Sequence, residues 1–78
     1  MIANEVMTVP VNSTLLATLS YDAAESILQI EFCDGSIYCY FGVPETAYHG
    51  LLTAESLGTY FNRQIRNGFR YTLLRCHK

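Results

Sequence analysis

Apolar and polar residues alternate along several segments in the first half of the chain. The clearest alternation runs from Leu15 to Tyr21, where every second residue is apolar and where Thr18 and Ser20 are polar. A period of two is typical of a β-strand with one buried face. The same reasoning predicts two further strands, over residues 27–33 and 36–41.

The dipeptide Asp34-Gly35 lies between the second and third of these strands and predicts a tight hairpin. Asp-Gly favours a two-residue type I′ turn, because both central positions of that turn need a positive φ. Such a turn pairs Cys33 with Ser36 and fixes the register. The core face then carries Leu28, Ile30 and Phe32 opposite Phe41, Cys39 and Ile37. The outer face carries Glu31 beside Tyr38 and Gln29 beside Tyr40.

The second half of the chain changes to a helical period. Pro44 suits a helix start, since the N–H that it lacks would be unbonded there, and an apolar stripe follows it to Leu51. Ser56 is a suitable N-cap for a second helix, which ends at Asn67-Gly68. The apolar face of this helix is Leu57, Tyr60, Phe61 and Ile65. Alternation over residues 69–73 predicts a short final strand.

These elements together predict an α+β fold, with a three-stranded antiparallel meander followed by two helices and a short C-terminal strand. The 78 residues, half of them hydrophobic, suffice for one packed core. We assign residues 11–78 to a single domain and residues 1–10 to a flexible arm, with room for a short strand near Val9 and Val11.

No apolar run is long enough to span a membrane. The first ten residues contain neither Lys nor Arg and do not resemble a secretory signal. A cytoplasmic location is therefore expected.

Cysteine and histidine residues are too sparse to predict a metal centre. Cys33, Cys39 and Cys76 are widely spaced, and no Cys-x-x-Cys pair occurs. The cysteines have no evident histidine partner for nucleophilic catalysis, and Glu31 and Asp34 form no obvious acid–base pair. We therefore expect no metal, no cofactor and no enzymatic activity.

Charge is separated along the sequence, because all seven acidic residues precede all five basic ones. Within the second helix, Arg63, Arg66 and Arg70 follow at steps of three and four, so they share one stripe if the helical geometry extends that far. Asn62 and Asn67 flank this stripe, which therefore offers cationic and amide donors to phosphate oxygens. Alternatively, the arginines complement the dipole at the helix C-terminus and bind no ligand.

Tyr38 and Tyr40 are two residues apart on a predicted strand and project from the same face. Two exposed aromatic rings on a sheet provide a surface on which nucleobases stack. Alternatively, the helices or the N-terminal arm cover this face, and the two tyrosines are packing residues.

Several short motifs, taken in order, resemble the KTSC domain, named for the C-terminal extension of some lysyl-tRNA synthetases. The similarity spans about residues 11–73. It rests on Tyr21-Asp22, Phe32-Cys33-Asp34-Gly35, Tyr38-Cys39-Tyr40, Val43-Pro44, the run from Ala54 to Asn62, and Ile65-Arg66. The resemblance implies a free-standing form of this domain. For the family, RNA binding is suggested by the attachment of the domain to a synthetase in other members, and no catalytic residues are assigned.

Two hypotheses follow for a small non-catalytic binding module. In the first, the module binds RNA, tRNA or another single-stranded nucleic acid, with Arg63, Arg66 and Arg70 on phosphates and with bases stacked on Tyr38 and Tyr40. In the second, the arginine stripe docks an acidic protein partner or a second copy of the chain. The acidic balance, with a pI near 5.5, departs from the basic character typical of an RNA-binding protein.

Overall fold

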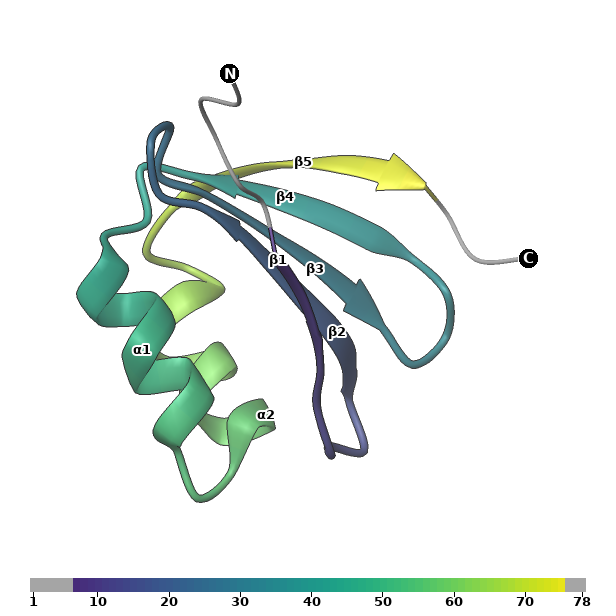
Figure 1. Ribbon diagram of the computed structural model, residues 1–78. Helices are drawn as coiled ribbons and strands as arrows, with labels where there is room; N and C mark the ends of the chain where they lie inside the picture. Colours follow the sequence, from purple (N-terminus) through teal and green to yellow (C-terminus); the bar gives the residue numbers. More distant parts are fainter. Residues whose placement is uncertain (1–6, 76–78) are drawn as a thin grey trace.

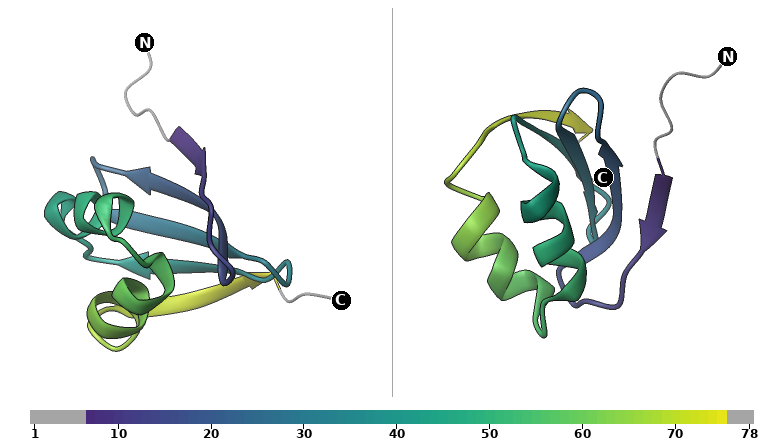
Figure 2. Two further views of the ribbon diagram at one scale, coloured as in Figure 1. Left: turned by 90° about the horizontal axis from the view of Figure 1, so that it is seen from below. Right: turned by 60° about the vertical axis from the view of Figure 1, so that its left-hand side comes forward.

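The computed structural model describes residues 7–75. Five strands form one antiparallel sheet in the order β1-β2-β3-β4-β5, so that each strand pairs with its neighbours in sequence. The helices lie between β4 and β5 in the chain and cover one face of the sheet (Figure 1; Figure 2). The elements are β1 (Met7–Pro10), β2 (Leu16–Asp22), β3 (Ile27–Phe32), β4 (Ile37–Phe41), α1 (Glu45–Thr53), α2 (Leu57–Tyr60), the π-helical turn η1 (Phe61–Ile65) and β5 (Arg70–Arg75).

The predicted α+β class is confirmed, but four strands precede the helices where three were predicted. The additional strand is β1, which pairs with β2 from Met7↔Tyr21 to Pro10↔Thr18. Residues 7–10 of the predicted arm therefore belong to the sheet, whereas residues 1–6 lie outside the described residues. Within residues 7–75, none of the helices has the length and apolar character that crossing a membrane requires.

The core lies between the sheet and the helices, and both predicted helix stripes contribute to it. Helix α1 buries Tyr48 and Leu51, and η1 buries Phe61 and Ile65. The second helix begins as expected, since the Ser56 side chain accepts a hydrogen bond from the Thr59 amide at 3.3 Å. The strands and the segment before α1 complete the core with Leu16, Leu19, Tyr21, Leu28, Ile30, Tyr40 and Val43.

The predicted register of the β3–β4 hairpin is wrong by one residue. Phe32 and Ser36 flank a three-residue loop, in which the amide of Gly35 donates to the carbonyl of Phe32 and the amide of Phe32 donates to the carbonyl of Ser36, both at 2.9 Å. Gly35 has a φ of 94°, as the left-handed position of such a loop requires. Leu28 therefore pairs with Tyr40, and Ile30 with Tyr38.

This change of register turns every side chain of β4 to the opposite face from the one predicted. Tyr38 and Tyr40 lie on the side of Leu28 and Ile30, which is the side covered by the helices, and not on the outer face. Glu31 consequently pairs with Ile37 and does not lie beside Tyr38.

Candidate functional site

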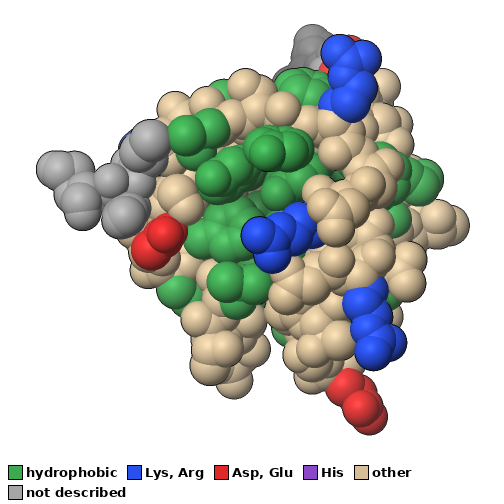
Figure 3. All heavy atoms as spheres, turned by 180° about the vertical axis from the view of Figure 1, so that it is seen from behind, with side chains coloured by type: hydrophobic (Ala, Val, Ile, Leu, Met, Phe, Trp, Pro, Cys, Tyr) green, Lys and Arg blue, Asp and Glu red, His purple; other side chains and the backbone are tan. Residues whose placement is uncertain are grey.

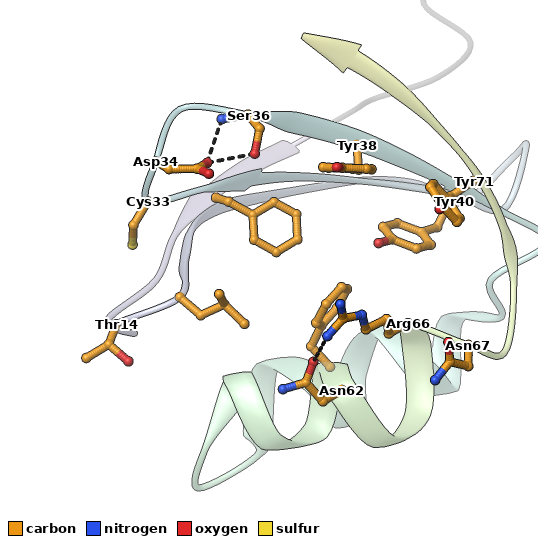
Figure 4. Close-up of a pocket in the computed structure, with 13 residues that line it drawn as sticks. Thr14, Cys33, Asp34, Ser36, Tyr38, Tyr40, Asn62, Arg66, Asn67 and Tyr71 are labelled. Carbon is orange, nitrogen blue, oxygen red and sulfur yellow. Dashed lines mark hydrogen bonds between the residues drawn. The ribbon is translucent and has the colours of Figure 1, made fainter. Parts of the chain in front are cut away.

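A groove of about 660 Å³ opens between the β3–β4 hairpin, the last two strands and the helical turn η1 (Figure 4). Its lining residues are Thr14, Leu15, Phe32, Cys33, Asp34, Ser36, Tyr38, Tyr40, Phe61, Asn62, Arg66, Asn67 and Tyr71.

One wall of the groove is an aromatic cluster on β4 and β5. The ring of Tyr71 lies 5.7 Å from that of Tyr38 and 5.5 Å from that of Tyr40, measured between ring centroids. Tyr40 is only 4% exposed, Tyr38 is half-buried, and Tyr71 is 57% exposed. The rings that a ligand can reach therefore belong to Tyr38 and Tyr71 and not to the predicted pair of Tyr38 and Tyr40.

Arg66 brings a positive charge to this aromatic wall. Its guanidinium Nη1 donates a hydrogen bond to Oδ1 of Asn62 at 3.2 Å, which orients the side chain over the groove (Figure 4). Burial raises the pKa of Tyr40 to about 12, with the neighbouring Tyr38 and Tyr71 adding to the rise and Arg66 opposing it. The positive charge of Arg66 is therefore close enough to the tyrosine cluster to favour the ionised form of Tyr40.

The three predicted arginines do not form one stripe. The amide of Arg66 donates to the carbonyl of Phe61 at 2.8 Å, which closes a π-helical turn, and the helix ends there. Arg63 instead lines a separate, smaller groove of about 300 Å³ with Thr59, and Arg70 starts β5 opposite Phe41. Of the predicted site residues, Tyr38, Tyr40, Asn62 and Arg66 come together, whereas Arg63 and Arg70 lie elsewhere.

Sequence reasoning did not identify Tyr71 and Asp34 as groove residues. The alternation over residues 69–73 predicted the strand that carries Tyr71, but no feature of the sequence indicated that this strand pairs with β4. The sequence predicts Asp34 as a turn residue, and its Oδ1 accepts hydrogen bonds from the amide and the hydroxyl of Ser36 at 2.9 and 2.7 Å.

The hairpin loop that carries Asp34 is held by Arg75 at the end of β5. Both Nε and Nη2 of Arg75 donate to the carbonyl of Gly35 at 3.2 Å, and Nη2 lies 3.5 Å from Oε2 of Glu31. Because this ion pair is exposed, its own contribution to stability is small. The contacts nevertheless connect the hairpin loop to the edge strand β5.

One face of the molecule is hydrophobic at its centre (Figure 3). The face shown in Figure 3 carries a central hydrophobic area, with one cationic side chain lying across it and an acidic one at its rim. Within residues 7–75, no group of three or more His, Cys, Asp or Glu side chains could hold a metal ion. In the described part of the chain, the groups that the groove presents to a ligand are thus aromatic rings, side-chain amides and individual charged side chains.

Comparisons with known proteins place this chain in one family. The KTSC domain model matches residues 12–71, a range that includes every residue lining the groove. A small protein of Tsukamurella paurometabola is 38% identical over 65 residues, which cover 83% of this chain and 97% of the relative. A lysine–tRNA ligase of Nostoc punctiforme is 36% identical over 61 residues, which cover 78% of this chain and 11% of the ligase.

A solved structure agrees with the sequence comparisons. The crystal structure of a KTSC domain protein from Yersinia pestis superimposes with a TM-score of 0.87 and 30% sequence identity, covering 91% of this chain and all of the other. The match in fold covers nearly the whole of this chain. The chain therefore belongs to the KTSC domain family.

Proposed function

We propose that this protein is a non-catalytic module that binds a short segment of single-stranded RNA in the groove. The observation that carries the proposal is that Arg66 and the tyrosines line the same groove. A base stacks on Tyr38 and Tyr71, while a neighbouring phosphate meets the guanidinium of Arg66. Aromatic stacking and a phosphate contact are the two interactions that single-strand binders combine.

The relatives support RNA as the ligand. The lysine–tRNA ligase of Nostoc punctiforme carries a segment similar to nearly the whole of this domain. A formal net charge of -2 opposes binding along an extended phosphate backbone. We therefore propose local binding of a few nucleotides, with affinity in the range of about 10⁻⁴–10⁻⁶ M at moderate salt.

The salt dependence of binding tests which arginines contact phosphate. A fluorescein-labelled eight-nucleotide RNA is titrated with protein between 25 and 200 mM salt, and anisotropy is measured. Contact through Arg66 alone predicts a slope of about -0.7 for log K against log [salt], whereas contact through all three arginines predicts about -2. Arg66→Gln should flatten the slope by about 0.7.

Arg63→Gln is the matched control, since Arg63 is an exposed arginine of the same helical turn that lies outside the groove. It should leave the slope and the affinity unchanged. The proposal fails if wild-type protein retains no RNA at 25 mM salt, or if the two variants behave alike.

A second candidate function is docking of a protein partner, and the exposure of β5 favours it. All of the side chains of β5 are exposed, including Leu73 at 42% and Leu74 at 54%. Exposed apolar residues on an edge strand, next to Arg70, suit an acidic partner or a second copy of this chain. Under this proposal, wild-type protein sediments as a dimer or captures an acidic peptide, and Leu74→Ser abolishes the association. A monomer at every concentration argues against self-association.

A further inference from the structure

Three side chains with N–H donors gather on one side of the groove. Figure 4 shows Asn62, Arg66 and Asn67 on the side of η1 and of the turn that follows it, whereas Asp34 and Ser36 lie at the hairpin end. A guanidinium has five N–H donors and a carboxamide has two. The single hydrogen bond from Arg66 to Asn62 therefore leaves donors on all three exposed side chains. They suit a ligand group with several acceptor oxygens around one centre.

Charge limits how many phosphates the groove can hold. Within residues 7–75, Arg66 is the only cationic side chain in the lining, since Arg63 lines the smaller groove and Arg70 starts β5 opposite Phe41. The formal net charge of -2 disfavours each further phosphate that has no cation beside it. An internal nucleotide brings a phosphate on either side of its sugar, whereas a terminal nucleotide can place a single end phosphate in the groove. The end of a strand therefore fits the groove better than its interior.

A terminal phosphate also differs from an internal one in its charge and its free oxygens. A phosphate monoester carries about -1.5 to -2 charges at pH 7 and has three acceptor oxygens. An internal phosphodiester carries one negative charge and has two free oxygens. Hydrogen bonds to ionised groups are stronger than neutral ones, and a guanidinium binds two phosphate oxygens side by side. A guanidinium with two carboxamides next to it therefore favours the monoester.

We infer that the groove binds the phosphorylated end of an RNA strand. The terminal phosphate monoester is held by Asn62, Arg66 and Asn67, and the terminal base stacks on Tyr71, which is 57% exposed. A groove of about 660 Å³ lies within the usual range of small-ligand sites, so it has room for one nucleotide. The inference rests on the RNA-binding function proposed above, and it names the part of the RNA that is recognised.

Unlabelled uridine pentanucleotides test this inference by isothermal titration calorimetry. They carry a phosphate at the 5′ end, a phosphate at the 3′ end, a methyl-esterified phosphate at either end, or no terminal phosphate. The methyl ester retains the phosphate but removes its second charge and its third free oxygen. At about 50 mM salt, one of the two phosphorylated RNAs should bind about 3- to 10-fold tighter than its methyl ester and than the unphosphorylated RNA. The preference is modest because the guanidinium is exposed.

Substitutions of groove residues test the assignment of the phosphate site. Arg66→Gln should bring the ratio between the phosphorylated RNA and its methyl ester to about 1. Asn67→Ala should lower this ratio only in part, because two of the three donor side chains remain. Arg63→Gln is the matched control and should keep the wild-type ratio, since Arg63 lines the separate groove. Thermal unfolding of each variant confirms that the domain is folded.

The outcomes separate the inference from the function on which it rests. A preference at either end that Arg66→Gln removes supports the inference and identifies the end. If all the RNAs bind equally and Arg66→Gln weakens them all, RNA binding stands and recognition of the end is overturned. If the preference survives in Arg66→Gln, the phosphate is bound elsewhere and the inference is wrong. Uridine monophosphate that binds as tightly as the better pentanucleotide also overturns it, because the groove then takes a free nucleotide. If no RNA binds, the inference and the proposed function both fail.

Discussion

The hydrogen bond between Tyr21 and Val43 holds the helical layer to the sheet, and its removal has a predictable cost. The Tyr21 hydroxyl on β2 donates to the carbonyl of Val43 at 2.6 Å, and Val43 is fully buried just before α1. The Tyr21 ring also stacks on Tyr48 of α1, with centroids 4.6 Å apart and planes at 14°. Tyr21→Phe removes the hydroxyl and retains the ring, so it isolates the hydrogen bond.

The expected loss of stability follows from the burial of the acceptor. A buried carbonyl that loses its partner costs about 1–3 kcal/mol. For a domain of this size, 1 kcal/mol lowers the melting temperature by about 4–8 °C. We therefore expect Tyr21→Phe to lower the free energy of unfolding by about 2 kcal/mol and the melting temperature by about 8–16 °C.

Urea unfolding followed by circular dichroism measures this loss, with the slope m compared between variants to confirm that the transition is unchanged. Tyr71→Phe is the control, since Tyr71 occupies the same cross-strand row on the edge strand β5 and is 57% exposed. Its effect should stay within about 0.5 kcal/mol. If Tyr21→Phe is as stable as Tyr71→Phe, the hydrogen bond does not hold the layers together and the reasoning is refuted.

Four further predictions concern the groove, its hairpin and helix α2. Tyr71→Ala should weaken RNA binding by about 1–3 kcal/mol, because it removes the exposed stacking ring; unchanged affinity in the anisotropy titration would exclude stacking on that residue. The phenol of Tyr40 has its pKa raised from 10.0 to about 12, so wild-type stability should fall as the pH rises from 10 to 12, by up to about 3 kcal/mol, and Tyr40→Phe should lack this part of the loss in urea unfolding at each pH. An equal loss in both proteins would contradict the assignment to Tyr40. Gly35→Ala should destabilise the domain by about 1–2 kcal/mol, since Gly35 has a φ of 94°. Gly58→Ala should instead stabilise it by about 0.5–1 kcal/mol, because its new Cβ would meet Leu15 only at 3.7 Å within a helix; thermal unfolding of the two variants checks the opposite signs.

The order and type of most elements could be predicted from the sequence, whereas the faces of β4 could not. The period of two and the caps locate β2, β3, β4 and α1 to within two residues. The residues of β4, however, are Ile-Tyr-Cys-Tyr-Phe, so either face can be buried and the pattern does not choose between them. The choice depends on the loop, and Asp-Gly occurs in two-residue turns and in three-residue loops with glycine in the left-handed position. One residue of loop length therefore decides where the tyrosines point.

The position of the arginines was unpredictable for a related reason. Steps of three and four residues place Arg63, Arg66 and Arg70 on one stripe only if a regular α-helix extends to Arg70. The π-helical turn at Phe61–Ile65 contains an extra residue, and the chain leaves the helix before Arg70. Arg66 therefore lines the aromatic groove and donates a hydrogen bond to Asn62, whereas Arg63 lines a separate groove together with Thr59.

These two local deviations from regular geometry act together on the groove. The three-residue loop turns Tyr38 toward the side of the sheet that the helices cover, and the π-helical turn ends the helix where Arg66 can reach the same side. With a two-residue turn, the tyrosines would lie on the outer face, away from Arg66. π-Helical turns are frequent at functional sites, and here Arg66, which lines the groove, directly follows the turn as its C-cap. The described part of the chain therefore presents an aromatic ring and a cation together at this groove, and not on the outer face of the sheet, where the sequence alone placed the tyrosines.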